Sequence, residues 1–116
     1  MFKKSTDMEL KIVESLRGGN GETKLLEIFS KDELRGKCRM FNKITLEPGC
    51  SIGTHPHHQE EEIYYVLSGK GIVEDNGKTY EIEPGDALKT GGGEFHSITN
   101  NGTEPLVFMA VILLFE

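Results

Sequence analysis

The chain has 116 residues, a formal net charge of −6 and 28% charged residues, which suits one domain with a single core. The negative charge and the lack of a basic stripe argue against nucleic acid or anionic lipid as the main partner. No signal-peptide pattern follows the N-terminus, and the longest apolar run, 106–115, is about half of what a membrane span needs. We therefore expect a cytoplasmic protein without a membrane segment, in which Cys38 and Cys50 stay reduced and pack as small hydrophobic side chains.

The first 37 residues are expected to be the less regular part of the chain. Segments 9–13 and 23–29 have strand-like composition, and a flexible glycine-rich loop lies between them. Ser30 begins the sequence SKDE, a capping box that predicts one short helical turn before Gly36. No linker makes this segment a separate domain, so we expect residues 1–37 to pack on the rest of the chain or on a partner subunit.

Residues 38–116 are predicted to form an all-β barrel or sandwich. Short strand-like segments are separated by turn residues at intervals of roughly ten. Asn76 and Gly77 are the favoured pair for a type I′ turn, which predicts an antiparallel hairpin around them. The expected strands are 38–46, 62–67, 71–74, 78–82, 87–90, 95–99 and 106–115.

The segment HPHHQEEE, residues 55–62, is rich in metal-ligand residue types. Residues two apart on a strand share a face, so His55 and His57 can present their imidazoles into one space. Glu62 begins the next strand and can face the same space. If the strand that carries His96 lies beside this hairpin, three imidazoles and a carboxylate converge, a suitable set for a transition metal. The alternative is a solvated polar loop.

At these positions the sequence resembles the cupins. The first cupin motif, in which HxH and a glutamate stand between two glycines, is matched at every spacing by Gly49, His55, His57, Glu62 and Gly69. The second motif is matched by Gly85, Gly93, His96 and Asn100, with Gly91 in place of its proline. The resemblance implies a small double-stranded β-helix, the cupin or jelly-roll barrel, with a metal bound inside by His55, His57, Glu62 and His96.

The motif spacing selects Glu62 among the three adjacent glutamates. Glu60 and Glu61 are then predicted to be rim or surface residues, together with Gln59 and His58. His58 stays open, because a small shift of its loop would let it reach the rim of the pocket.

Three further residues are candidate contacts for a substrate. Met40 and Asn42 share an alternating face with Ile44, which we take to point inward. Tyr64 lies on the ligand face of its strand, where packing in the barrel is the alternative role. A buried Asn42 amide would need a hydrogen-bonding partner, such as a water, a backbone group or a ligand.

A six-coordinate metal held by these four residues keeps two positions for a ligand with two oxygen donors. The expected cofactor is one divalent transition metal per chain, manganese, iron, nickel or zinc. The resemblance implies a metal-dependent enzyme acting on a small carboxylated or oxygenated substrate, as a decarboxylase, isomerase, dioxygenase or lyase. Oxalate decarboxylases carry an arginine three residues before the first metal histidine, where this sequence has Ile52.

Two alternatives to an enzyme stay open. One is a non-catalytic cupin that binds a small molecule, with a metal that is structural or anchors the ligand. The other is an empty barrel that serves only as an oligomer module. In each case the apolar final strand and the N-terminal segment favour a homodimer.

Overall fold

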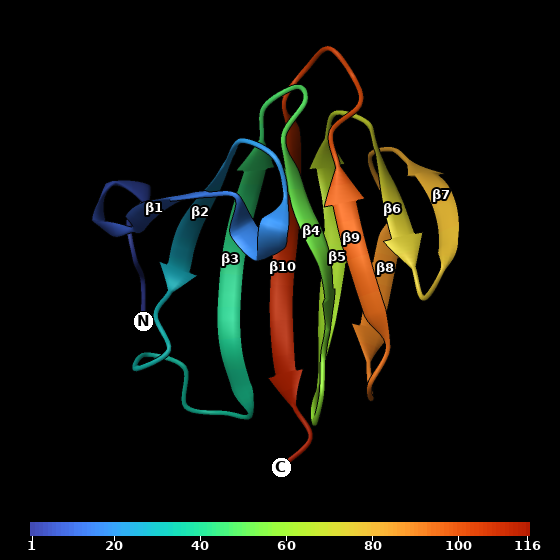
Figure 1. Cartoon of the computed structure of the whole chain (residues 1–116). Helices are drawn as coiled ribbons and strands as arrows, with labels where there is room; N and C mark the ends of the chain where they lie inside the picture. The colour runs from blue at the N-terminus through green and yellow to red at the C-terminus, as the bar shows by residue number, and fades with distance from the viewer.

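The computed structural model describes all 116 residues, and most of them lie in β-strands (Figure 1). The strands are β1 (Glu9–Glu14), β2 (Glu22–Phe29), β3 (Cys38–Leu46), β4 (Ser51–Pro56), β5 (Glu60–Ser68), β6 (Gly71–Asp75), β7 (Lys78–Ile82), β8 (Ala87–Gly91), β9 (Phe95–Thr99) and β10 (Leu106–Leu114). Two short 3-10 turns, η1 (Ser5–Asp7) and η2 (Leu16–Gly18), complete the elements. No helix has the length and apolar character needed to cross a membrane.

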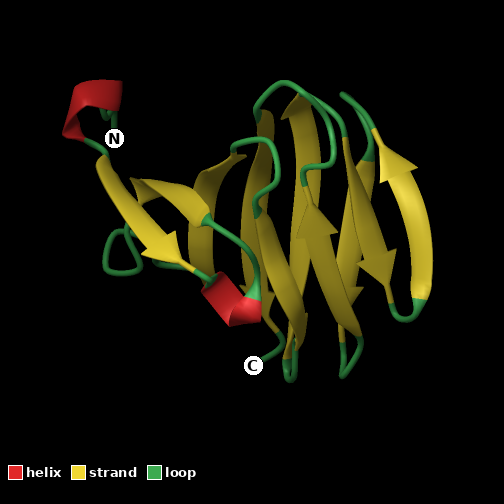
Figure 2. Cartoon of the chain, turned by 45° about the horizontal axis from the view of Figure 1, so that its top comes forward, coloured by secondary structure: helices red, strands yellow, loops and turns green.

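Two antiparallel sheets face each other and enclose the core (Figure 2). The larger sheet has the strand order β1-β2-β3-β10-β5-β8, and the smaller one has the order β4-β9-β6-β7. From β3 to β10 the chain passes back and forth between the two sheets, which is the winding of a double-stranded β-helix. The all-β barrel predicted from the sequence is therefore confirmed.

The core between the sheets follows the two-residue alternation of the strands. On β10, Leu106, Phe108 and Ala110 are fully buried, while the residues between them lie on the outer face and are half-buried. Opposite them, Val73 and Ile98 of the smaller sheet are also buried. Removal of this apolar surface from water is the main stabilising term for the barrel.

Local signals in the sequence found most elements. β3, β7 and β9 have the predicted bounds, and Asn76 and Gly77 take positive φ values of 49° and 93°, as a type I′ turn requires. The capping box is also present, because Ser30 and Glu33 exchange backbone-to-side-chain hydrogen bonds of 2.7 and 3.2 Å. Only β4 was not among the expected strands. Its sequence contains Gly53 and Pro56, both poor strand formers.

The N-terminal segment joins the larger sheet, because β2 pairs with β3 and β1 pairs with β2. The connection between β1 and β2, residues 15–21, includes η2 and is called the strap below. It extends to β4 of the other sheet, where the N–H of Ser51 donates to the carbonyl of Asn20 at 2.9 Å (Figure 1). The division of the chain at residue 37 stays a prediction.

Candidate metal centre

Four buried side chains converge inside the barrel, and they are the four that the sequence predicted. His55 lies one residue before the end of β4, His57 follows that strand, Glu62 lies on β5 and His96 on β9. The Nε2 atom of His96 lies 3.1 Å from that of His55 and 3.2 Å from that of His57. Oε1 of Glu62 lies 2.9 Å from Nε2 of His57 and 3.1 Å from Nε2 of His96. Each residue offers one ligand atom, and all four atoms lie within 4.8 Å of one another.

A β-bulge brings the first histidine opposite the last. Ile52 of β4 pairs with Ile98 of β9, but the next pair is His55 with His96, so β4 holds one residue more than its partner. A bulge of this kind redirects the following side chain, here the imidazole of His55. His57 is fixed by backbone hydrogen bonds, because its N–H donates to the carbonyl of Glu94 at 3.0 Å.

The contacts of the Nδ1 atoms determine that Nε2 is the ring nitrogen that faces the centre. Nδ1 of His55 lies 2.7 Å from the carbonyl oxygen of Gly53, and Nδ1 of His57 lies 2.5 Å from Oε2 of Glu60. Both partners only accept hydrogen bonds, so in the neutral ring the hydrogen lies on Nδ1 and Nε2 keeps its lone pair. That tautomer is the one required of a metal ligand. Nδ1 of His96 is buried without a partner.

Glu60 does not lie on the rim, which corrects the prediction for this residue. Its side chain points inward and binds Arg39 through two hydrogen bonds of 2.7 and 2.8 Å, in addition to its contact with His57. The two-residue alternation that placed Glu62 and Tyr64 inward also applies one step earlier, to Glu60. Extending the alternation to the first residue of the strand would have found it.

Other residues of the polar segment lie where the sequence placed them. His58 and Gln59 are exposed, and Glu61 points outward, with Oε1 3.7 Å from Nζ of Lys89. His58 is not among the residues that line the cavity beside the metal donors.

Arg39 was missed by the sequence analysis because a second bulge places it. Ile112 of β10 pairs with Met40 and Leu113 pairs with Cys38, so Arg39 has no opposite residue. The extra residue bends β3 and lets the guanidinium reach Glu60. A bulge depends on the register between two strands that are far apart in the sequence, and no local pattern around Arg39 predicts it.

The electrostatics of the cluster follow from burial and from its close contacts. The pKa of Glu62 is about 2: burial opposes ionisation, but hydrogen bonds from His57 and His96 outweigh it. Burial would also lower the pKa of His57, yet the carboxylates of Glu62 and Glu60 raise it above its ordinary value. Burial lowers the pKa of His55. The hydrogen bond from Arg39 lowers the pKa of Glu60 to about 2.

The donor set fits a divalent transition metal. Two donors at right angles, each about 2.1 Å from one ion, lie about 3.0 Å apart. Four of the donor separations here are between 2.9 and 3.2 Å. Imidazole nitrogens and one carboxylate suit zinc, iron, nickel or manganese. The four residues could therefore hold one metal ion.

A cavity of about 140 Å³ lies beside the four donors. Seven of its twelve lining residues are hydrophobic, and Met40 and Tyr64 are among the lining residues. Asn42 is buried but does not line the cavity. The substrate contacts suggested for these three residues stay predictions.

Tyr64 places a hydroxyl group beside the four metal-donor atoms. Its hydroxyl lies 3.5 Å from Nε2 of His96, and its ring stacks on that imidazole with centroids 4.9 Å apart. Burial, together with the charge of Glu62, raises the pKa of Tyr64 well above its ordinary value. The hydroxyl therefore keeps its proton at neutral pH.

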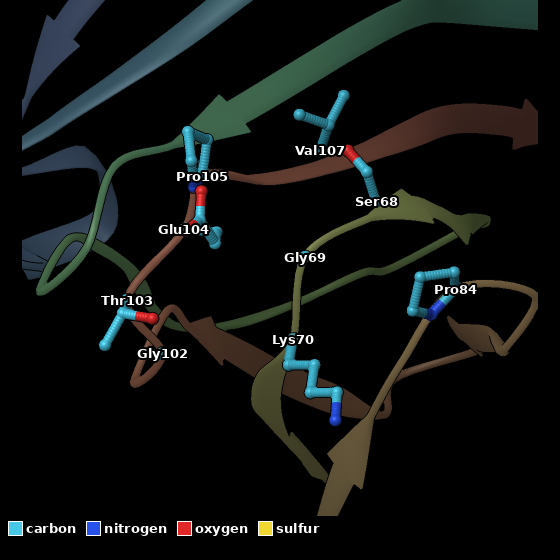
Figure 3. A pocket seen from close by; sticks show the side chains of 9 residues that line it. All are labelled: Ser68, Gly69, Lys70, Pro84, Gly102, Thr103, Glu104, Pro105 and Val107. Atoms are coloured by element: carbon cyan, nitrogen blue, oxygen red, sulfur yellow. The ribbon is translucent and has the colours of Figure 1, made fainter.

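A larger cleft of about 820 Å³ lies at the other end of β5 (Figure 3). Ser68 and Val107 contribute to it, and Lys70 and Glu104 are its charged residues. Ser68 lies six positions after Glu62 on an extended strand, a distance of about 20 Å. The cleft contains none of the four metal donors and no histidine, so we place the functional site at the smaller cavity.

Comparisons with known proteins were made with the whole chain. Residues 42–112 match the family model described as a cupin domain. An oxalate-binding protein of Thermotoga maritima is 42% identical over 114 residues, which cover 98% of this chain and 94% of the relative. A crystal structure described as a predicted oxalate decarboxylase from Thermotoga maritima has a TM-score of 0.93 and 42% identity, and 98% and 99% of the two chains are covered. The polyketide cyclase RemF of Streptomyces resistomycificus has a TM-score of 0.79 and 25% identity, with 100% and 81% covered.

Proposed function

The chain belongs to the cupin family, and we propose that it is a metal-dependent enzyme acting on a small carboxylated substrate, with oxalate as the first candidate. One observation carries the proposal. Four buried donors converge, and three of them, His55, His57 and Glu62, line a cavity whose remaining lining is mostly apolar. In surroundings that are mostly apolar, charge interactions between the site and a bound substrate would be stronger than in bulk water.

The size of the cavity limits the substrate. Pockets for drug-sized ligands are commonly about 300 to 1,000 Å³. The cavity here has about 140 Å³, so a ligand of only a few non-hydrogen atoms suits it. A small dicarboxylate such as oxalate meets this limit, and the names of the Thermotoga maritima sequence and structure that this chain resembles support the same choice. Ile52, where oxalate decarboxylases carry arginine, counts against a close copy of that enzyme.

In a decarboxylation, the residues of this chain would have distinct tasks. A bound metal supplies Lewis-acid polarisation of the substrate carboxylate. Conversion of hydrogen oxalate to formate and carbon dioxide breaks the carbon–carbon bond and places a proton on the remaining carbon. The Tyr64 hydroxyl, beside His96, holds a proton at neutral pH and is our candidate proton donor.

The first test is elemental analysis of untagged protein purified without added metal, beside the variant His96→Ala. We expect close to one transition metal per chain in the native protein and little in the variant. Tyr64→Phe serves as the matched variant that keeps all four donors. The metal found, manganese, iron, nickel or zinc, is then used to assay oxalate for formate and carbon dioxide. If neither protein holds metal after reconstitution with any of the four, the proposal is wrong.

A second candidate is a non-catalytic cupin that binds a small carboxylate at its metal. The contacts of Glu60 favour this candidate. Glu60 is the other buried carboxylate beside the site, and it already forms hydrogen bonds with Arg39 and His57. That contact leaves Glu60 poorly placed as an acid or base. Saturable oxalate binding without any formate or carbon dioxide would select this candidate, whereas turnover would select the enzyme.

We also propose that the chain forms a homodimer through the outer face of the larger sheet. The occupant we expect is a second copy of this chain. Met109 and Val111 of β10 are only half-buried there, and Tyr65 and Leu67 on the neighbouring β5 are 47% and 43% exposed. Apolar patches of this kind mark protein interfaces, and two-fold homodimers are the commonest oligomers. Sedimentation of the native protein and of Tyr65→Lys tests this proposal, since a native monomer would contradict it.

A further inference from the structure

The cavity beside the metal donors contains two arginines that differ in their contacts. Arg39 is engaged with Glu60 through two short hydrogen bonds. Arg17, from the strap, also lines the cavity, but it is an exposed residue and its guanidinium makes no hydrogen bond or ion pair within the chain. Arg17 is therefore the cation of this cavity that is free to bind an anion.

We propose that Arg17 binds the carboxylate of the substrate that lies away from the metal, so that the site selects small dicarboxylates over monocarboxylates. This inference rests on the proposed function and deepens it by naming the substrate class. One end of the ligand is assigned to the metal position between His55, His57, Glu62 and His96, and the other end to Arg17.

The rest of the lining offers little to a second carboxylate. Its apolar members are side chains such as Leu16, Leu25 and Ile112, which have no hydrogen-bond donor. An ionised carboxylate in such surroundings needs a paired charge or strong hydrogen bonds. Tyr64 is a donor, but its hydroxyl lies beside Nε2 of His96 and so serves the metal end. A guanidinium can bind both oxygens of a carboxylate at once, which adds geometric selectivity.

The backbone of the strap holds Arg17 in an uncommon conformation. Arg17 has φ 55° and ψ 30°, and Ser15 has φ 51° and ψ 42°, both in the left-handed region that few non-glycine residues occupy. Hydrogen bonds of 2.9 Å fix the turn, from the N–H of Ser15 to Gly21 and from the N–H of Gly18 to Ser15. Such conformations persist where the surrounding structure imposes them, and they are enriched at ligand sites.

Two glycines allow the strap to lie directly on β4. A Cβ atom added at Gly53 would overlap the carbonyl oxygen of Arg17, and one added at Gly19 would overlap the carbonyl oxygen of Ser51. Gly53 also accepts the hydrogen bond from Nδ1 of His55. One backbone segment of β4 thus positions both a metal donor and the strap that carries Arg17.

The test compares native protein with Arg17→Gln and Arg17→Lys, each loaded with the metal found in the native protein. Binding of oxalate and of formate is measured by isothermal titration calorimetry, and the metal content of each sample is determined. We expect Arg17→Gln to bind oxalate about 10- to 100-fold more weakly, the range typical of a lost hydrogen bond to a charged group. Arg17→Lys should restore part of the affinity, and formate binding should change less than about twofold.

Arg35→Gln is the matched control, because Arg35 is an exposed arginine that does not line the cavity. Equal oxalate affinity in the native protein and Arg17→Gln, with native metal content in both, would overturn the role of Arg17 and leave the proposed function intact. If metal-loaded native protein binds neither oxalate nor formate, the proposed function fails and this inference fails with it. An equal loss of oxalate and formate affinity in Arg17→Gln would also overturn the claim, since Arg17 would then not act on the second carboxylate.

Discussion

The carboxylate of Glu60 lies behind the imidazole of His57, so that Nδ1 of the ring faces Glu60 and Nε2 faces the metal position. Arg39 holds the same carboxylate from its other side with two hydrogen bonds. The three residues form a chain that fixes the tautomer and the orientation of one metal donor. Outer partners of this kind commonly affect metal affinity about 10- to 100-fold.

We therefore expect Glu60→Gln to weaken metal binding by about 10- to 100-fold while the fold is kept. The amide of the variant removes the negative charge and loosens both contacts. Competition with a metal-binding dye measures the dissociation constant. Glu61→Gln is the control, because Glu61 points outward on the same strand. An unchanged constant in Glu60→Gln would show that His57 needs no support from Glu60.

The stability of the metal-free protein should fall as the pH drops from about 4.5 toward 2. Glu60 and Glu62 have a pKa of about 2 in the folded chain and an ordinary value of 4.5. Carboxylates with a lowered folded pKa add stability above the ordinary value, and this stability is lost as the pH falls through the folded value. Urea unfolding at several pH values measures the slope. Glu62→Gln should have a shallower slope, whereas the exposed Glu81→Gln should keep the native one.

For His57 the dependence of stability on pH has the opposite sign, so its contribution falls as the pH rises. Its raised folded pKa adds stability to the metal-free protein that is fully present below pH 6.5 and is lost as the pH rises through the folded value. Metal binding needs the neutral imidazole, so metal affinity should increase over the same rise in pH. Chelator competition across pH 6 to 8.5, beside urea unfolding of the metal-free protein, checks both trends. Two trends of the same sign would contradict this assignment.

Gly53→Ala should destabilise the protein by about 1 to 3 kcal/mol, the usual cost of inserting a methyl group where there is no room. The added carbon would meet the carbonyl of Arg17, so the strap or β4 must move. Thermal and urea unfolding measure the loss. Gly36→Ala is the control, since a Cβ atom there meets nothing within 4 Å. Equal stability of the two variants would show that the strap can move away from the added methyl group without a loss in the free energy of unfolding.

Phe108→Ala should cost about 3 to 5 kcal/mol, because it leaves a cavity in the core between the sheets. Phe108 is fully buried and packs on Tyr64 with ring centroids 4.7 Å apart. Phe2→Ala is the control, because Phe2 is 84% exposed. Urea unfolding of the two variants gives the difference. A loss below 1 kcal/mol for Phe108→Ala would mean that the core can close around the missing ring.

Local patterns were enough for most of the strands, and the resemblance to the two cupin motifs supplied the metal donors. The alternation of apolar residues predicted β3, and the pair Asn76 and Gly77 predicted the hairpin turn. The fixed spacing of the first cupin motif selected Glu62. What the sequence did not show depends on segments far apart in the chain. Arg39 reaches Glu60 only through a bulge between β3 and β10, and Arg17 meets the cavity only because the strap crosses to the other sheet.

The separation of the strap from the metal donors has a consequence for redesign. The donors lie between residues 55 and 96, whereas the strap is a seven-residue loop that begins at Ser15. Exchanging side chains on the strap would alter the charge and size of the cavity lining, while the four metal donors stay in place. The barrel therefore combines a fixed set of metal donors with a separate, variable loop, and altered ligand binding can be sought by varying residues 16 and 17 alone.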